Sequence, residues 1–313
     1  MLSHFAYTHT RGPLAGKRAK PDAAVAGGDL MDTALAFRLV DELAAAGVNS
    51  ITWTGGGEPT LHPDFDAIVE RAQASGLEQG IYTHGGHLPG PRASLLKRAM
   101  TFVYVSLDAW NAEAYKRDKG VDRFDAACDG IRRLAAAEGP AAIGIGYLIT
   151  AKNWGSAGYA AQLPERLGAD YVQFRPTVLY EQDAPGEAAE NTDWLEPASE
   201  LLARVADTHP TRVIVDIERF RMYRDWQGHG YPTCWWSTLQ TVVTPNGKVW
   251  TCVNLREHPS AEIGDLSVET FADIWARRPV ATVGPECRIM CRGHVANTEL
   301  ERIFAKREHT AFV

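Results

Sequence analysis

Residues 50–65 read SITWTGGGEPTLHPDF, and this stretch decides the fold. An apolar strand at 50–54 runs into three glycines, and a helical pattern follows. Because glycine has no Cβ, such a backbone can approach a ligand closely. Glu58 places a carboxylate beside this backbone, which suits a ligand with an ammonium group. The plainer alternative is a tight strand–helix turn in which the glycines only relieve steric crowding.

The same strand–loop–helix order repeats along the chain. Upstream, apolar residues recur at helical spacing between Asp32 and Gly47, which predicts an amphipathic helix. Downstream, strands expected at 80–83, 102–107, 143–150 and 171–176 alternate with helices near 63–75, 91–99, 123–137 and 154–167. This alternation predicts a parallel sheet of βα units. Each strand ends in polar or glycine residues, where barrel-like α/β folds carry their chemistry.

The pattern changes beyond residue 180. Residues 181–199 are acidic and contain Ala, Pro and Asn, which predicts a surface excursion. Asn246-Gly247 separates two apolar stretches and predicts a β-hairpin, because both residues tolerate positive φ. The remaining expected elements are a helix near 194–207, strands at 211–217, 238–244 and 248–252, and helices near 268–277 and 297–308.

Composition limits the class of protein. The 313 residues are 45% hydrophobic and 23% charged, as is ordinary for a soluble globular protein. The net charge of -7 argues against nucleic-acid partners, which require a basic surface. No apolar run approaches the ~18 residues that a membrane span needs. Basic residues near the N-terminus have no apolar run behind them, so we expect no signal peptide and a cytoplasmic protein.

Four of the five cysteines lie in the last third of the chain, which indicates a metal site rather than disulfides. These candidate ligands are Cys234, Cys252, Cys287 and Cys291. Four thiolates suit Zn²⁺ or an iron–sulfur cluster, and four buried cysteines without metal are a third possibility. Cys128 falls at an apolar position of a predicted helix, so we assign it to the core.

The complete string around Glu58 closely resembles the GGEP motif of radical S-adenosylmethionine enzymes. That motif holds the methionyl amino group in the family, and similar strand ends follow here in the same order. The resemblance implies an α/β fold, a partial (β/α)6 TIM-like barrel, with a small C-terminal cluster-binding extension that contains the hairpin. It implies these residues for S-adenosylmethionine binding: Gly55, Gly56, Gly57, Glu58, Pro59, Thr83, His84, Ser106, Asp108 and Arg175.

The cysteine spacing resembles the twitch or SPASM extension of the same family. Twelve residues separate Cys234 from Gly247, and four separate Gly247 from Cys252. Four cysteines fit the shorter twitch form with one auxiliary [4Fe–4S] cluster. The domains expected are a barrel over 1–180, a connecting segment over 181–230 and a cluster domain over 231–313.

The family's C-x-x-x-C-x-x-C motif is missing, because no cysteine precedes Cys128. The chain also opens with a loop instead of a strand, and His4 stands near where the third cysteine would fall. We therefore expect that the first strand and its loop are lost from this sequence through a truncated start. A degenerate homologue that has lost the chemistry is the alternative. A second, catalytic [4Fe–4S] cluster is expected only if a longer protein carries the motif.

The resemblance also implies a mechanism. A reduced cluster cleaves S-adenosylmethionine, and the resulting 5′-deoxyadenosyl radical abstracts hydrogen from a small-molecule substrate. An electron donor such as flavodoxin or ferredoxin is the expected partner, with neither nucleic acid nor membrane. A non-catalytic binding protein and a zinc-dependent α/β enzyme are the competing hypotheses. Candidate substrate contacts at the strand ends are His84, His87, Tyr104, Asp108 and Trp110.

Overall fold

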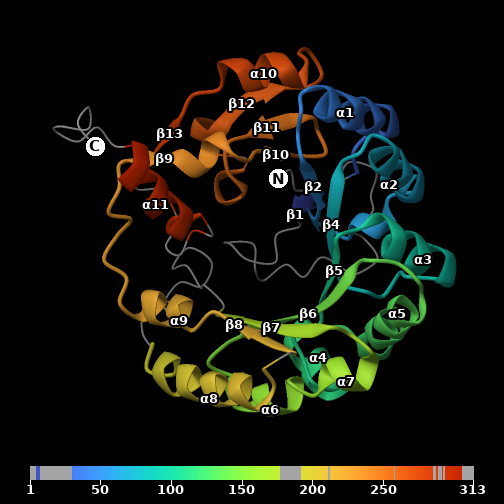
Figure 1. The fold of residues 1–313 in the computed structure, drawn as a ribbon, viewed down its shortest axis with the longest axis vertical. Coiled ribbons are helices and arrows are strands. Elements are labelled where there is room, and N and C mark those ends of the chain that lie inside the picture. Colours follow the sequence, from blue (N-terminus) through green and yellow to red (C-terminus); the bar gives the residue numbers. More distant parts are fainter. Residues whose placement is uncertain are drawn as a thin grey trace.

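A curved, six-stranded parallel sheet forms the centre of the computed structural model (Figure 1). The structure describes residues 5–7, 30–176, 192–210, 212–256, 258–284, 287, 291 and 293–304. The strands follow the order β2 (Ser50–Trp53), β4 (Glu78–Thr83), β5 (Phe102–Ser106), β6 (Ala142–Ile149), β7 (Tyr171–Pro176) and β8 (Val213–Val215). This mixed α/β architecture confirms the predicted fold class.

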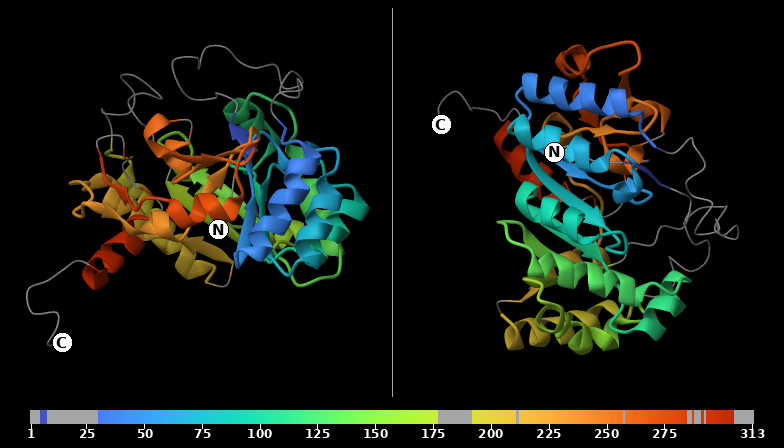
Figure 2. Two further views of the ribbon diagram at one scale, coloured as in Figure 1. Left: turned by 90° about the horizontal axis from the view of Figure 1, so that it is seen from above. Right: turned by 90° about the vertical axis from the view of Figure 1, so that its right-hand side faces the viewer.

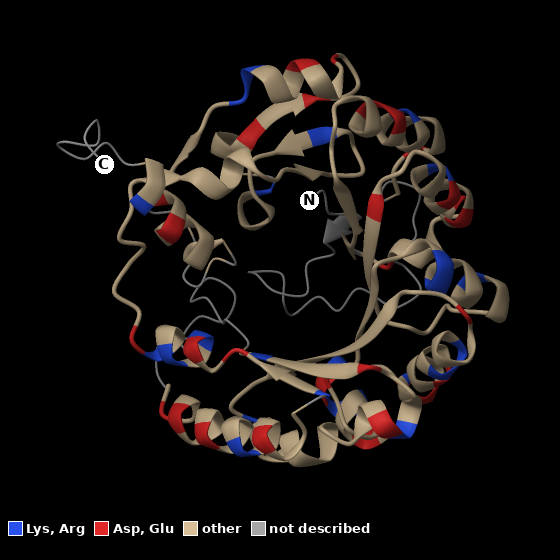
Figure 3. Cartoon of the chain, viewed as in Figure 1, with Lys and Arg blue, Asp and Glu red and all other residues tan. Residues whose placement is uncertain are grey.

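Helices cover the outer face of the sheet (Figure 1). The principal ones are α1 (Thr33–Ala45), α2 (Phe65–Ala74), α3 (Gly90–Ala99), α5 (Phe124–Ala136), α7 (Leu163–Leu167) and α8 (Leu195–Thr208). Charged residues lie mainly along these outer helices (Figure 3). The helix predicted near 154–167 is divided into η2 (Trp154–Ser156), α6 (Ala157–Ala160) and α7. Two short helices that the sequence did not predict are α4 (Ala112–Lys119) and α9 (Ile217–Arg224).

The two faces of the sheet differ in chemistry. Strand residues such as Val103, Ile145 and Phe174 are buried and belong to the hydrophobic core under the helices. The opposite face carries a row of paired positions, Tyr82, Tyr104, Gly144 and Tyr171. Glycine is required there because a Cβ at Gly144 would lie 2.4 Å from the Tyr171 ring. The inner face is therefore aromatic and polar, and the outer face builds the core.

The structure adds two strand pairings to the sequence analysis. Strand β8, within the strand predicted at 211–217, pairs with β7 through Phe174 and Val215, so the sheet continues beyond residue 180. A short strand β1 (Phe5–Tyr7) pairs in parallel with β3 (Gly55–Gly56), where the sequence predicted a loop. Three residues are too few for a periodic pattern to appear. His4 and most of the predicted excursion at 181–199 lie outside the described residues.

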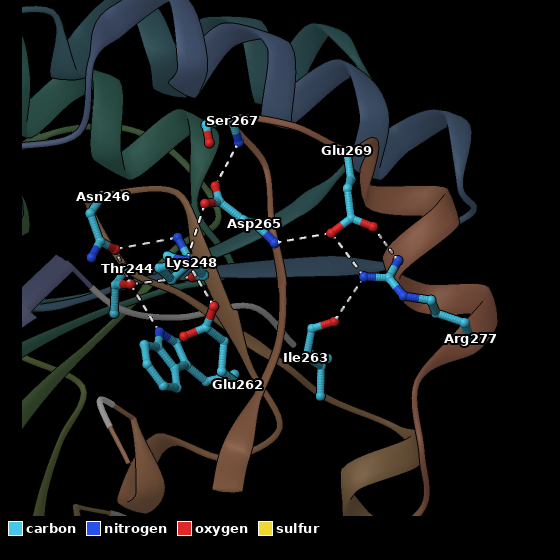
Figure 4. A network of polar contacts seen from close by, with 10 residues as sticks. Thr244, Asn246, Lys248, Glu262, Ile263, Asp265, Ser267, Glu269 and Arg277 are labelled. Atoms are coloured by element: carbon cyan, nitrogen blue, oxygen red, sulfur yellow. Dashed lines mark hydrogen bonds and ion pairs between the residues drawn. The ribbon is translucent and has the colours of Figure 1, made fainter. Parts of the chain in front are cut away.

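The C-terminal part contains the predicted hairpin. Strands β10 (Val242–Val243) and β11 (Lys248–Trp250) are antiparallel, and Gly247 turns between them with φ +80°. A third strand, β12 (Glu262–Asp265), was not predicted and pairs with β11. Figure 4 shows how Lys248 links this strand to the hairpin through Glu262 at 2.8 Å and Asp265 at 3.1 Å. This part also contains β9 (Thr233–Cys234), β13 (Ala281–Thr282), α10 (Phe271–Arg277) and α11 (His294–Phe304).

Helix α1 connects the sheet to this C-terminal part (Figure 2). The Glu42 carboxylate accepts a 2.6 Å hydrogen bond from the backbone N–H of Phe271, the first residue of α10. Arg38, one turn earlier, donates to the carbonyl of Leu266. An acidic side chain at a helix N-terminus also matches the helix dipole. The position of the C-terminal strands is thus fixed by one face of α1.

Helix α5 packs against the turn that follows β4 so closely that only glycine fits. A Cβ at Gly130 would lie 2.0 Å from the carbonyl oxygen of Gly85. We expect Gly130→Ala to lower the free energy of unfolding by ~1–3 kcal/mol, because the helix must move outward. Gly158→Ala is the matched control, because nothing lies within 4 Å of its Cβ position. Chemical denaturation would measure both, and equal stabilities would contradict this packing.

Candidate functional site

Glu58 holds the glycine-rich loop to the neighbouring strand end. Its carboxylate accepts hydrogen bonds of 2.6 Å from the Thr83 hydroxyl and 2.7 Å from the His84 backbone N–H. It also accepts from the backbone and hydroxyl of Thr60 and so caps η1 (Pro59–Leu61), in which Pro59 is the first residue. The Glu58 side chain is 5% exposed. The carboxylate therefore braces the loop, and its direct contact with a ligand stays a prediction.

His84 occupies a fixed orientation above this carboxylate. Its Nδ1 accepts a 2.9 Å hydrogen bond from the Gly86 N–H, which can only donate. In the neutral ring the hydrogen therefore sits on Nε2, which lies 3.6 Å from a Glu58 oxygen. The His87 ring packs 5.2 Å from His84, and burial together with that neighbour lowers the His87 pKa.

Gly57 is the open part of the loop. It is exposed, and nothing lies within 4 Å of the position of a Cβ built on it. No positive φ requires glycine there. The fold therefore does not require glycine at this position, and the bare backbone lies open next to Glu58. This arrangement suits a ligand that contacts the main chain.

Asp108 closes the end of β5 against β6. It has the left-handed φ of +55°, which Asp tolerates better than most residues. One carboxylate oxygen accepts from the Leu148 N–H at 2.9 Å, and the other pairs with Lys119 at 2.8 Å. Lys119 also donates to the Ser106 carbonyl at 3.0 Å. Asp108 and Ser106 therefore share one ammonium group, and their contacts to a ligand stay predictions.

Arg175 lies on the inner face among tyrosines. Its guanidinium carbon is 4.7 Å from the Tyr104 ring centroid and 5.8 Å from that of Tyr82. The Arg175 Nε and the Tyr104 hydroxyl are buried without a hydrogen-bond partner among the described residues. Burial raises the pKa of Tyr104, so the hydroxyl keeps its proton. The predicted Arg175 thus belongs to an aromatic cluster with unused polar atoms.

The four C-terminal cysteines line one cavity, as their spacing predicted. Cys234 ends β9, Cys252 follows the hairpin, and Cys287 and Cys291 lie on the connection to α11. Cys128 is instead buried in α5, as expected for a core residue. Among the residues that the structure describes, no three His, Cys, Asp or Glu side chains are grouped to hold a single metal ion.

Each of the four sulfur atoms accepts an N–H hydrogen bond. Backbone donors serve three of them: Asn254 to Cys252 at 3.3 Å, Gly284 to Cys287 at 3.4 Å and Gly293 to Cys291 at 3.3 Å. The Asn297 side-chain amide donates to Cys234 at 3.4 Å. Such donors stabilise thiolates bound to iron. The donor set therefore fits a cluster that is held by four thiolates.

Burial changes the acidity of these thiols. It raises the pKa of Cys252, and it raises the pKa of Cys291 to about 11, although N–H donors oppose both shifts. These two thiols are therefore protonated near neutral pH. Metal binding must displace these protons, because thiolates are the ligands.

A cluster of rings borders the same cavity. The Tyr231 hydroxyl lies 3.1 Å from His294 Nδ1 and 3.3 Å from His229 Nδ1, and Trp226 packs 5.0 Å from both imidazoles. Burial raises the pKa of Tyr231 to about 12. Sequence reasoning missed these residues and Asn297, because each becomes relevant only through contacts between segments distant in the sequence.

Comparison with known families agrees with this geometry. Residues 20–154 match the model of the radical SAM superfamily, and residues 234–292 match SPASM, an iron–sulfur cluster-binding domain. The second match contains all four cavity cysteines. The fold and site thus define the class of proteins that combine a radical S-adenosylmethionine domain with a cluster-binding extension. This chain belongs to the radical SAM family with a SPASM-like C-terminal domain.

Curated relatives share part of the chain. Mycofactocin maturase MftC of Mycobacterium tuberculosis is 34% identical over 132 residues, which are 42% of this chain and 33% of the maturase. A probable GTP 3′,8-cyclase of Thermococcus kodakarensis is 28% identical over 196 residues, 60% of this chain and 58% of the cyclase. The match thus spans about a third of the maturase and somewhat more than half of the cyclase. Both relatives are named for an enzymatic activity, which supports the conclusion that this chain is an enzyme.

Solved structures share the fold. Streptococcus suis SuiB matches with a TM-score of 0.66 at 12% identity, over 89% of this chain and 65% of SuiB. Native anSMEcpe with bound AdoMet matches with a TM-score of 0.61 at 15% identity, over 88% of this chain and 80% of that one. At such low identity the likeness concerns the fold alone. In the described part of this chain, none of the helices is both long and apolar enough to span a bilayer.

The bond between Thr83 and Glu58 allows a direct test of the loop brace. Thr83 is buried, and its hydroxyl also accepts from the Gly85 N–H at 3.0 Å. Thr83→Val keeps the shape but leaves these partners unpaired, so we expect a loss of ~1–3 kcal/mol in unfolding free energy. Thr208→Val is the control, because that exposed hydroxyl contacts only its own helix. Thermal or denaturant unfolding that finds equal losses for the two variants would contradict a stabilising bond between Thr83 and Glu58.

Proposed function

We propose that this chain is a radical S-adenosylmethionine enzyme that acts on a small-molecule substrate by hydrogen abstraction. S-adenosylmethionine would bind along the edge formed by the loop at 55–59 and the ends of β4, β5 and β7. One [4Fe–4S] cluster would bind in the cavity of four cysteines. The observation that carries the proposal is that all four thiols line one cavity and each has its own N–H donor.

The residues of this edge suit such a ligand. Gly57 offers open backbone for contact with the methionyl group, and Glu58 adds negative charge close by. The inner face beyond it provides the Tyr104 hydroxyl and the Arg175 guanidinium, which have unused donor atoms. S-adenosylmethionine would supply the hydrogen-abstracting radical only after it takes one electron from a catalytic [4Fe–4S] cluster, whose C-x-x-x-C-x-x-C ligands a longer protein would have to provide. The residues of this edge would orient the reactants and exclude water.

The C-terminal cavity would hold its cluster with protein ligands alone. Four thiols are present, so each iron of a cubane cluster can take one sulfur ligand from the chain. A cluster without an open iron site suits electron transfer or structural support better than direct substrate binding. We assign it the acceptance of an electron from the substrate after hydrogen abstraction. A flavodoxin- or ferredoxin-like donor and a cytoplasmic setting complete the proposal.

A second candidate function is binding without catalysis. The chain contains five cysteines, of which four line the cavity and Cys128 lies in the core. No C-x-x-x-C-x-x-C motif is present in this sequence. These residues provide ligands for one cluster, so the chain as given would retain the auxiliary site without a catalytic one.

Iron content tests the cluster assignment. After anaerobic reconstitution with iron and sulfide, we expect about four iron atoms per chain and a brown chromophore. Cys252→Ala should lose most of both, because it removes one ligand. Cys128→Ala removes an equally sized group from the core and should keep them. About eight iron atoms would contradict the single site, and bound zinc without colour would support the zinc alternative.

Gly57 tests the S-adenosylmethionine edge separately. Gly57→Val should leave the thermal unfolding midpoint unchanged, because the space around this residue is open. The new side chain would cover the backbone and weaken S-adenosylmethionine binding at least ~10-fold, or ~1.4 kcal/mol. Gly90→Val is the control, since it is equally open but starts α3. Unaltered affinity in equilibrium dialysis would place the ligand elsewhere.

A further inference from the structure

The hydrogen bonds to the four sulfurs are of two kinds. Cys252, Cys287 and Cys291 accept from backbone N–H groups, which every residue except proline provides. Cys234 accepts from a side chain, the amide of Asn297. Among these four hydrogen bonds of the described residues, the one to Cys234 thus depends on a particular amino acid 63 residues away in the sequence.

Asn297 is buried next to Cys234 and has hydrogen bonds at both ends of its amide. It lies on α11, is 1% exposed, and its Oδ1 accepts a 2.7 Å hydrogen bond from the backbone N–H of Trp236. That N–H can only donate, so the amide oxygen must face it and the NH₂ group must face the sulfur at 3.4 Å. A burial this complete is uncommon for a polar side chain unless its hydrogen bonds are satisfied.

We propose that Asn297 positions the Cys234 thiolate and raises the reduction potential of the auxiliary cluster, an inference that rests on the proposed cluster site. Reduction adds negative charge to the cluster and its sulfurs. An N–H dipole directed at a sulfur stabilises that added charge, so the donor favours the reduced state. Because the Asn297 side chain is 1% exposed and so shielded from water, the contribution is larger than it would be from an exposed amide. The residue thus makes the cluster a better electron acceptor.

A purely structural role is the competing explanation. Asn297 also connects α11 to Trp236, and any variant there loosens the surroundings of Cys234. Ser237 provides a matched control. It is 3% exposed, and its hydroxyl accepts from the Ala281 N–H at 3.1 Å and donates at 2.6 Å to the carbonyl of Cys234 rather than to the sulfur. Ser237→Ala therefore disturbs the same cysteine through its backbone.

The experiment is a redox titration of the reconstituted full chain, followed by the visible and electron paramagnetic resonance signals of the cluster. Asn297→Asp keeps the acceptor for Trp236 but replaces the donor with a negative charge. Asn297→Ser is neutral and too short to reach the sulfur. Both variants should shift the midpoint potential to more negative values, Asp further than Ser. Ser237→Ala should stay at the wild-type potential.

The outcomes separate this inference from the proposed function. A wild-type chain that takes up no iron would overturn the cluster site itself. Asn297 variants with full iron content and the wild-type potential would overturn only the role of the amide, as would an equal shift in Ser237→Ala. Loss of the cluster from both Asn297 variants, with Ser237→Ala fully loaded and all three chains equally folded by circular dichroism, would support positioning of the Cys234 ligand.

Discussion

The asymmetry of the central sheet is the constraint on which the rest of the structure depends. Its outer face is apolar and packs under the helices, so the register of each strand is fixed, because a slip of one residue would turn the core side chains inward. The inner face carries tyrosines over glycines, as at Tyr104 and Gly146, where a Cβ would lie 2.3 Å from the ring. One face provides stability, which leaves the other free to be aromatic and polar.

Parallel pairing then determines where the candidate site lies. All six strands end at the same edge, so loops distant in sequence meet there without needing long-range bonds of their own. Glu58 links the glycine loop to Thr83 and His84 across this edge, as Asp108 links the ends of β5 and β6. Charge-assisted hydrogen bonds to a buried carboxylate are stronger than neutral ones. Removing one donor therefore leaves the buried charge incompletely hydrogen-bonded, which destabilises the folded state.

The sequence revealed those parts that depend on local patterns. Alternating strands and helices, the Asn246-Gly247 hairpin and the spacing of four cysteines all leave a repeated or short-range signal, and the structure contains each of them. It did not reveal β8 as part of the sheet, because strand order depends on packing of the whole chain. Nor could it reveal that Glu58 is turned into the protein, or that Asn297 meets Cys234, since both facts arise from contacts between remote segments.

The two halves of the molecule are organised by different physical effects. The sheet edge is fixed by hydrophobic packing and strand pairing, and neither of these requires a bound ligand. The cysteine cavity is different, because burial keeps thiols such as Cys291 protonated and the N–H donors around them bond more strongly to thiolates. Iron that replaced such protons would offset the charge of the buried thiolates, and the N–H donors would then bond more strongly to the sulfurs. The donors are in place before the cluster, so the cavity is preorganised for a ligand whose charge completes it.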